Sequence, residues 1–194
     1  MVLNALKTEL EALNEVLENA GEDPVNGLTG MPRSGARALR SLRSVNAQMQ
    51  ADTSFWHNNG RRNVTLNPDS ITSKIALGAN VVSVSASRRC HDVTNRGGFL
   101  FDIENDTDLF TSSIEVNMKI LLEWDELNVQ NQWYFIKVAS RLYQQRWLVN
   151  DKRHNYNLAD EQQARGIAVS ANNTEAKISI LDHPTLARYN NRNV

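Results

Sequence analysis

The spacing of the apolar residues changes twice along this 194-residue chain, and this limits the fold more than any other feature. In residues 1–61 they recur at every third or fourth position, which gives an α-helix one apolar face. In residues 62–124 they recur at every second position, as on a β-strand, and in 125–182 the helical spacing returns. The sequence therefore predicts an α+β fold, in which a helical bundle of about four helices carries an inserted small antiparallel β-lobe.

The N-terminal segment is predicted to form a helical hairpin. Five leucines at spacings of three and four indicate a first helix running to about Ala20: Leu3, Leu6, Leu10, Leu13 and Leu17. Glycines and prolines break the pattern in 21–32, and Ser34 is the expected cap of a second helix. The apolar face of that helix consists of Leu39, Leu42, Val45 and Met49. The first helix is acidic and the second is rich in arginine, so the two are expected to pair.

The central segment is predicted to contain four or five strands. Val82 and Val84 alternate with serines, and Asn95-Arg96-Gly97-Gly98 is typical of a tight hairpin turn. The strand after this turn is expected to bury Phe99, Phe101 and Ile103, which lie on one face. A last strand has the same period in Ile114, Val116, Met118, Ile120 and Leu122.

Two further helices and an extended arm are predicted after Asp125. The third helix has an apolar face formed by Trp133, Ile136, Val138, Ala139, Leu142 and Tyr143. The fourth is expected to begin at a cap formed by Asn157, to continue through Ile178 and Leu181, and to end at His183-Pro184. Residues 185–194 contain two arginines and no acid, and they fit an arm that becomes ordered on binding a partner. The predicted segments are thus a hairpin (1–61), a β-lobe (62–124), helices that complete the bundle (125–182) and the C-terminal arm (183–194).

The charges are balanced overall but segregated along the chain. The net charge of −1 argues against a protein that mainly coats a polyanion, because non-specific DNA affinity comes from an excess of Lys and Arg. Residues 1–30 contain six acids and one lysine, residues 31–62 contain six arginines and one acid, and residues 98–130 contain eight acids and one lysine. Such blocks are expected where segments or neighbouring copies pair, although solvated faces would give the same pattern. Arg33, Arg37 and Arg40 could thus face the acidic helix, a neighbouring copy or DNA.

The residues that usually carry catalysis do not form a recognisable constellation. The four histidines are isolated, the adjacent Cys90 and His91 would point to opposite faces of a strand, and no phosphate-binding loop or nucleophile elbow is present. The acidic segment Asp102–Asp108 lacks the glycine and the closing glutamate of a calcium loop, so a solvated acidic turn is expected there. We therefore predict no enzyme activity, no metal and no cofactor. No apolar run approaches the roughly 18 residues of a membrane span, so no membrane contact is predicted.

Three stretches, taken in this order of elements, resemble the tail tubular protein A family of short-tailed bacteriophages. They are LNEVLENAGEDPVNGL at 13–28, NRGGFLFD at 95–102 and WYFIKVASRLYQQR at 133–146, and the second is the most specific. The order of elements covers nearly the whole chain. The chain departs from the family in a shortened loop near Ser87 and in an arm richer in Asn and Arg.

The resemblance implies a structural virion protein, the adaptor ring subunit between portal and tail nozzle. The implied assembly is a twelve-fold ring located beneath the portal vertex and assembled in the host cytoplasm. Its implied partners are the portal protein, a nozzle protein of the tail tubular protein B type, tail fibres, and double-stranded DNA that passes through the lumen without sequence-specific binding. The alternative is a DNA-binding or packaging accessory protein that uses the arginines of the second helix.

Three groups of residues are candidate contacts. The first is predicted to reach the portal or a neighbouring copy, and it comprises Thr185, Leu186, Arg188, Tyr189, Asn190 and Arg192 in the C-terminal arm. The second is the hairpin turn at Asn95, Arg96, Gly97 and Gly98, which is predicted to contact the nozzle or a neighbour. The third comprises Arg33, Arg37 and Arg40, which are predicted to lie at a contact between subunits or in the lumen.

Overall fold

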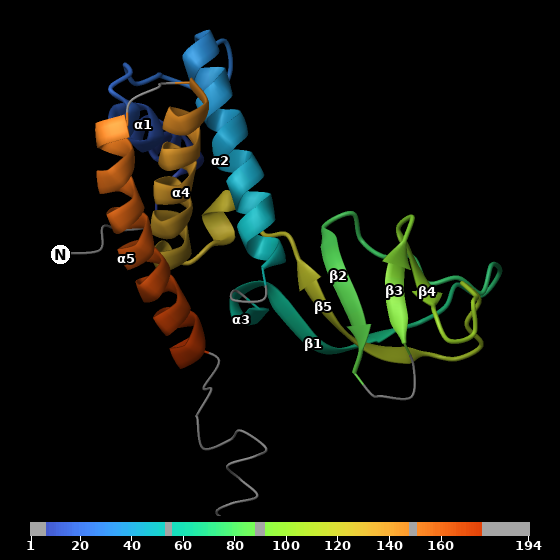
Figure 1. Cartoon of the computed structure of the whole chain (residues 1–194). Helices are drawn as coiled ribbons and strands as arrows, with labels where there is room; N and C mark the ends of the chain where they lie inside the picture. Colours follow the sequence, from blue (N-terminus) through green and yellow to red (C-terminus); the bar gives the residue numbers. More distant parts are fainter. Residues whose placement is uncertain (1–6, 53–55, 88–91, 148–150, 176–194) are drawn as a thin grey trace, which may run out of the picture.

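The computed structural model describes residues 7–52, 56–87, 92–147 and 151–175, and it confirms the predicted α+β fold (Figure 1). Long helices form a helical body, and a β-lobe projects from one side of it. The long helices are α1 (Glu9–Ala20), α2 (Arg33–Ala51), α4 (Val129–Trp147) and α5 (Asp151–Glu175). The lobe is inserted between α2 and α4, so the chain leaves the body once and returns to it once.

Helix α4 lies at the centre of the body, where it packs against α1, α2 and α5. Its buried apolar residues confirm most of the predicted face and extend it: Tyr134, Phe135, Ile136, Val138, Ala139 and Tyr143. A helix that is covered by three neighbours needs apolar residues on more than one side. The body is therefore a bundle built around α4, and the N-terminal hairpin of α1 and α2 is part of it.

Helix α1 begins later than its leucine pattern predicts. Thr8 is the N-cap and has an extended backbone, and its hydroxyl accepts a hydrogen bond from the Glu11 N–H at 3.3 Å. The Glu11 carboxylate in turn accepts a bond from the Thr8 N–H at 2.8 Å, which completes a capping box. Leu3 and Leu6 lie outside the described residues. The spacing of Thr8 and Glu11 is the sequence signal that predicts this start.

Two predicted helix caps are wrong. Helix α2 has Pro32 at its N-cap position, so Ser34 lies within the first turn. A proline fits there because the first N–H groups of a helix have no partner inside the helix. Helix α5 begins at Asp151, so Asn157 lies inside it. The predicted end of this helix at His183-Pro184 lies outside the described residues.

The described part of the lobe contains five strands, in agreement with the prediction of four or five. These are β1 (Gly60–Leu66), β2 (Val81–Ala86), β3 (Val93–Arg96), β4 (Phe99–Asp102) and β5 (Ile114–Ile120). They form an antiparallel sheet in the order β1-β5-β2 and a separate antiparallel hairpin of β3 and β4. The central strand β5 buries Ile114, Val116 and Met118, which confirms its predicted face.

A β-bulge changes the orientation of residues in β2. The pairing register with β5 shifts between Val81 and Ser83, so Val82 lies in the irregular step. Val82 is consequently exposed while Val84 is buried, although the two are separated by a single serine. The regular alternation predicted for Val82 and Val84 is therefore interrupted at Val82.

The predicted buried face of β4 is also wrong, because the strand is turned the other way. Leu100 and Asp102 are buried, while Phe99 is 40% and Ile103 48% exposed. Beside β4, the Leu100 N–H donates to the Ile75 carbonyl at 2.9 Å, so the segment around Ile75 extends the hairpin sheet. Leu100 and Ile75 then pack with the buried residues of β2 and β5. The inner set contains the carboxylate of Asp102, which is buried because it bonds to Asn105, so alternation alone favoured the wholly apolar outer set.

Buried polar side chains connect the lobe to the helical body; Gln50, Asn59 and Lys119 are here called the joint. The Gln50 amide donates to the Leu122 carbonyl at 2.9 Å and accepts from the Leu122 N–H at 2.7 Å. Asn59, at the end of the short helix α3 (Trp56–Asn59), donates to the Gln50 carbonyl at 2.7 Å. The Lys119 ammonium donates to the carbonyls of Ala51 at 3.2 Å and Asp52 at 2.9 Å. The segment that leaves the helical body at Gln50 is thus hydrogen-bonded to the segment that returns to it at Leu122.

Candidate interaction surfaces

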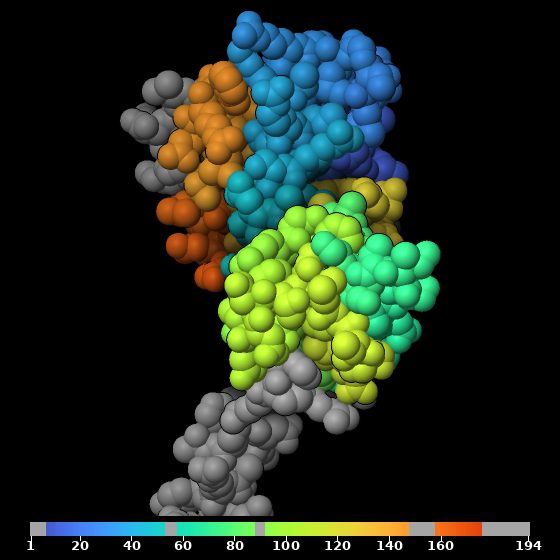
Figure 2. All heavy atoms as spheres, turned by 90° about the vertical axis from the view of Figure 1, so that its right-hand side faces the viewer, coloured from blue at the N-terminus to red at the C-terminus, as the bar shows by residue number. Residues whose placement is uncertain are grey.

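The outer face of the hairpin sheet exposes large apolar side chains; it is here called the lobe face. It is formed by Phe99 and Phe101 of β4, by Ile103 directly after this strand and by Leu109, which is 54% exposed. Leu109 belongs to it because it forms a β-bridge with Lys74, while Ala76 forms one with Phe99. Figure 2 views the molecule toward this end, where the segments around residues 75 and 105 lie side by side on the surface.

Two cations lie over the aromatic rings of the lobe face. The guanidinium of Arg96 lies 3.6 Å from the ring centre of Phe101, and the Lys74 ammonium lies 5.7 Å from that of Phe99. Lys74 also forms an ion pair with Asp108. Cations placed in this way are attracted by the negative faces of the rings while remaining accessible to water. The lobe face therefore offers apolar area with a charged rim, a combination found at many protein interfaces.

The turn after β4 carries the carboxylates at the outer end of the lobe (Figure 1). Asp102 is buried, and its carboxylate accepts bonds from the Asn105 N–H at 3.1 Å and the Asn105 amide at 2.9 Å. Glu104 and Asp106 are exposed, and among the residues that the structure describes neither forms an ion pair. The predicted solvated acidic turn is thus correct for these two residues and wrong for Asp102, which holds the turn together.

The predicted hairpin turn has the expected geometry. Gly97 and Gly98 have φ angles of 63° and 84°, and they form a two-residue loop between the paired Arg96 and Phe99. The Asn95 side chain accepts a bond from the Gly98 N–H at 3.1 Å, which fixes the turn from within. The turn lies beside the lobe face, and both glycines are exposed. A role of these residues in contact with a partner stays a prediction.

The arginines of α2 lie along one outer stripe of the helix and differ in their contacts. Arg43 forms a bidentate ion pair with Glu9, at 2.7 and 2.9 Å, which raises the pKa of its guanidinium. The Arg37 guanidinium lies 3.9 Å from the ring centre of Trp147. Arg33 and Arg40 are exposed, and no ion pair joins them to any residue in the described ranges. The expected pairing of the acidic and basic helices is therefore limited to Arg43.

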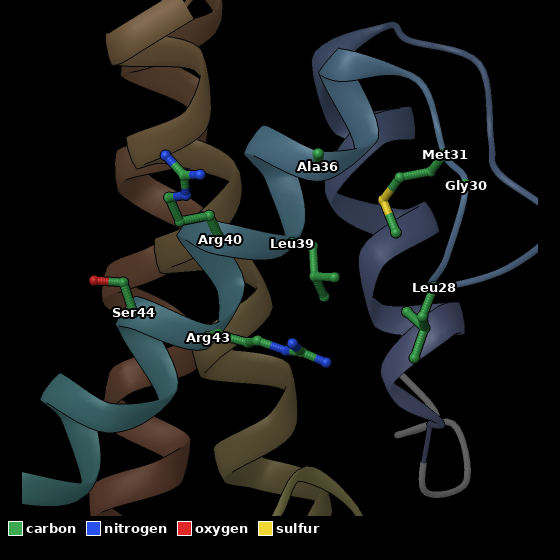
Figure 3. Close-up of a pocket in the computed structure, with 8 residues that line it drawn as sticks. All are labelled: Leu28, Gly30, Met31, Ala36, Leu39, Arg40, Arg43 and Ser44. Atoms are coloured by element: carbon green, nitrogen blue, oxygen red, sulfur yellow. The ribbon is translucent and has the colours of Figure 1, made fainter.

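A shallow groove of about 680 Å³ lies beside this stripe, between α2 and the segment that precedes it. Figure 3 shows Leu28, Met31 and Leu39 directed into the groove together with Arg43, while Arg40 and Ser44 point away at its rim. The groove into which Leu28, Met31, Leu39 and Arg43 are directed is here called the α2 groove. Periodicity in the sequence does not predict this groove, because Leu28 and Met31 lie in a Gly- and Pro-rich connection.

The ionisable side chains of the described residues point to no metal centre. No group of three or more His, Cys, Asp or Glu side chains that could hold a metal ion is found among these residues. The shifted pKa values there have structural causes: burial lowers the pKa of Lys119 and raises those of Tyr134 and Tyr143. None of the described helices has both the length and the apolar character to cross a membrane. The predicted arm contacts, Thr185 to Arg192, lie outside the described residues.

A comparison with protein families matches most of the chain. A family model described as "Tube: Tail tubular protein" matches residues 10–178, which include both the helical body and the β-lobe. A search of curated proteins finds no match to the chain.

Proposed function

The chain belongs to the tail tubular protein family of short-tailed phages, and from this premise we propose that it is the adaptor subunit between portal and tail nozzle. As a member it is a structural component of the phage tail that assembles into tail oligomers. The adaptor role requires a subunit that transmits position and force between two other rings. The proposed ring has twelve copies, and the genome passes through its lumen during ejection.

The joint is the observation that carries this proposal. A connector must hold its two ends in a fixed relation, because a loose hinge would let one partner ring tilt against the other. Gln50 is 0% exposed and bonds through both its amide atoms to the backbone of Leu122, on the returning chain. A hydrogen bond between a buried amide side chain and the backbone is costly to break, because breaking it leaves buried polar groups without partners. These bonds hold the lobe in one orientation relative to the helical body.

The charge and the chemistry of the chain support a passive DNA channel. A lumen that must release a sliding duplex should not accumulate phosphate contacts, because each one adds to a salt-dependent affinity. The net charge of −1 fits this requirement. We assign no enzymatic step to the protein. In this proposal the C-terminal arm, 183–194, contacts the portal or a neighbouring copy.

Cryo-electron microscopy of intact particles tests the adaptor role. The expected result is density for this fold as a ring directly below the portal, with the nozzle on its far side. Native mass spectrometry of the chain mixed with its portal provides the copy number. Density for the chain elsewhere in the tail, with another protein at the portal, contradicts the proposal.

A second candidate, a DNA-binding or packaging accessory protein, is favoured by Arg33 and Arg40, which no described carboxylate neutralises. Free guanidinium groups on an exposed helix can contact phosphates. This function requires DNA binding by the isolated protein that weakens steeply as salt is raised. Absent or salt-insensitive binding is the result expected for the adaptor.

A further inference from the structure

We propose that the lobe of one copy binds α2 of the next copy, so that the ring closes through two unlike patches. The first patch is the acidic tip, formed by Ile103, Glu104, Asp106 and Leu109. The second is the α2 groove with the exposed arginines Arg33 and Arg40 at its side. This inference rests on the proposed ring and adds to it the surfaces that hold neighbours together.

The acidic tip combines apolar area with negative charge. Ile103 and Leu109 are 48% and 54% exposed, which is high for large aliphatic side chains. Glu104 and Asp106 lie in the turn between them, and neither has a cation partner in the described part of the chain. The turn is held by the buried Asp102 carboxylate, so the tip presents its side chains from a fixed backbone.

The α2 side offers the complementary properties. Leu28, Met31 and Leu39 supply an apolar groove that is open to solvent (Figure 3). Arg33 and Arg40 are two helical turns apart on the outer stripe of α2, and both are exposed. Each patch thus lacks what the other supplies: the tip has unpaired carboxylates, and the helix has unpaired guanidinium groups.

The two patches cannot meet within one copy, because the tip is at the outer end of the lobe and α2 belongs to the helical body (Figure 1). The joint fixes this separation. A cyclic ring of identical subunits uses head-to-tail contacts, which require two different complementary patches on every copy. DNA, in contrast, would engage the arginines but would leave the apolar groove and the acidic tip without a function.

A charge exchange between two variants tests the pairing. One variant is Arg33→Glu with Arg40→Glu, which makes the α2 side acidic; glutamate at position 33 also suits the N-terminus of a helix. The other is Glu104→Lys with Asp106→Asn, which makes the tip basic. Asparagine is used at 106 because this residue has a φ of 49°, which asparagine adopts with less strain than lysine. Every substituted residue is exposed.

Each variant is supplied to a phage that lacks this gene, alone or together with the other, and its incorporation into purified particles is measured. Either variant alone places like charges opposite each other at every contact, so incorporation should fall at least about tenfold. Together they form an alternating ring in which every tip meets a groove of opposite charge, and incorporation should recover. Asp160→Lys with Arg165→Glu, on the exposed surface of α5, is the control that leaves incorporation unchanged.

Two outcomes overturn the pairing and leave the adaptor role intact. If both variants incorporate as well as wild type, neither patch is needed between copies. If each fails alone and the mixture also fails, the patches bind other partners, such as portal, nozzle or DNA. Failure of the adaptor role itself is seen separately, as wild-type density away from the portal. Circular dichroism of each variant confirms that its fold is retained.

Discussion

Gln50 connects the helical body to the returning chain from the C-terminal end of α2, a helix with one exposed side. Replacing it by alanine removes both hydrogen bonds to Leu122 and leaves that buried N–H and C=O without partners. We expect Gln50→Ala to lower the free energy of unfolding by roughly 2–4 kcal/mol, measured by urea denaturation. Gln48→Ala, on the exposed side of the same helix, is the control and should change it by less than about 0.5 kcal/mol. Equal effects of the two substitutions would show that the joint is not a stabilising contact.

Lys119 makes the stability depend on pH in a defined direction. Burial lowers the pKa of its ammonium below the ordinary 10.5. Between the lowered value and 10.5 the unfolded chain binds more protons than the folded one, so this residue makes stability rise with pH there. Tyr134 and Tyr143 act in the opposite direction, because burial raises their pKa values above 10.0, but only near and above that pH.

Lys119→Met isolates this effect. Wild type and variant are unfolded in urea at several pH values from about 8 to 10.5, and the tyrosines, which both proteins contain, cancel in the comparison. The wild-type free energy of unfolding should rise more steeply with pH than that of the variant. Parallel pH profiles would mean that the lysine titrates alike in folded and unfolded chains.

At the scale of elements, the β3–β4 turn needs its two glycines for their backbone conformation and not for lack of space. A Cβ added at Gly97 or Gly98 would meet no atom within 4 Å, so a substitution cannot fail by collision. Gly98 has a φ of 84°, outside the range that side-chain-bearing residues favour, while Gly97 at 63° lies where asparagine is tolerated. We expect Gly98→Ala to destabilise the protein by about 1–2 kcal/mol in thermal unfolding, and Gly97→Asn by much less. The reverse order would contradict the assigned turn.

The sequence predicts the identity of the elements better than their orientation. Strong periodicity located α1, α4 and β5, and the Asn-Arg-Gly-Gly turn located the hairpin, because these signals are local. The inner face of β4 was predicted wrongly, since Phe99 and Leu100 are both apolar and only the pairing with Ile75 decides between them. The joint was not predicted at all. In the sequence, Gln50 cannot be distinguished from a surface glutamine, because its partner Leu122 is brought to it only by the fold.

At the scale of the whole molecule, two apolar cores must keep a fixed position relative to each other. The larger core lies among the helices and the smaller one in the lobe, and Ile120 of β5 packs against both. A core as small as that of the lobe gives little stability by itself. The lobe therefore depends on its attachment to the helices, through Ile120 and through the polar bonds of the joint.

Breaking the joint should accelerate the opening of the lobe and of the helices together. In Gln50→Ala with Asn59→Ala, the bonds from both side chains across the crossing are lost, while the larger core is untouched. In wild type, amide hydrogen exchange of β5 should approach that of α4, because the two open together. In the double variant, β5 and α4 should both exchange at least about tenfold faster, since the lost bonds stabilise the folded state against lobe opening and global unfolding alike. Acceleration of β5 alone would show that the lobe opens independently of the helices, and unchanged exchange in both elements would show that apolar packing, not the joint, holds the subunit together.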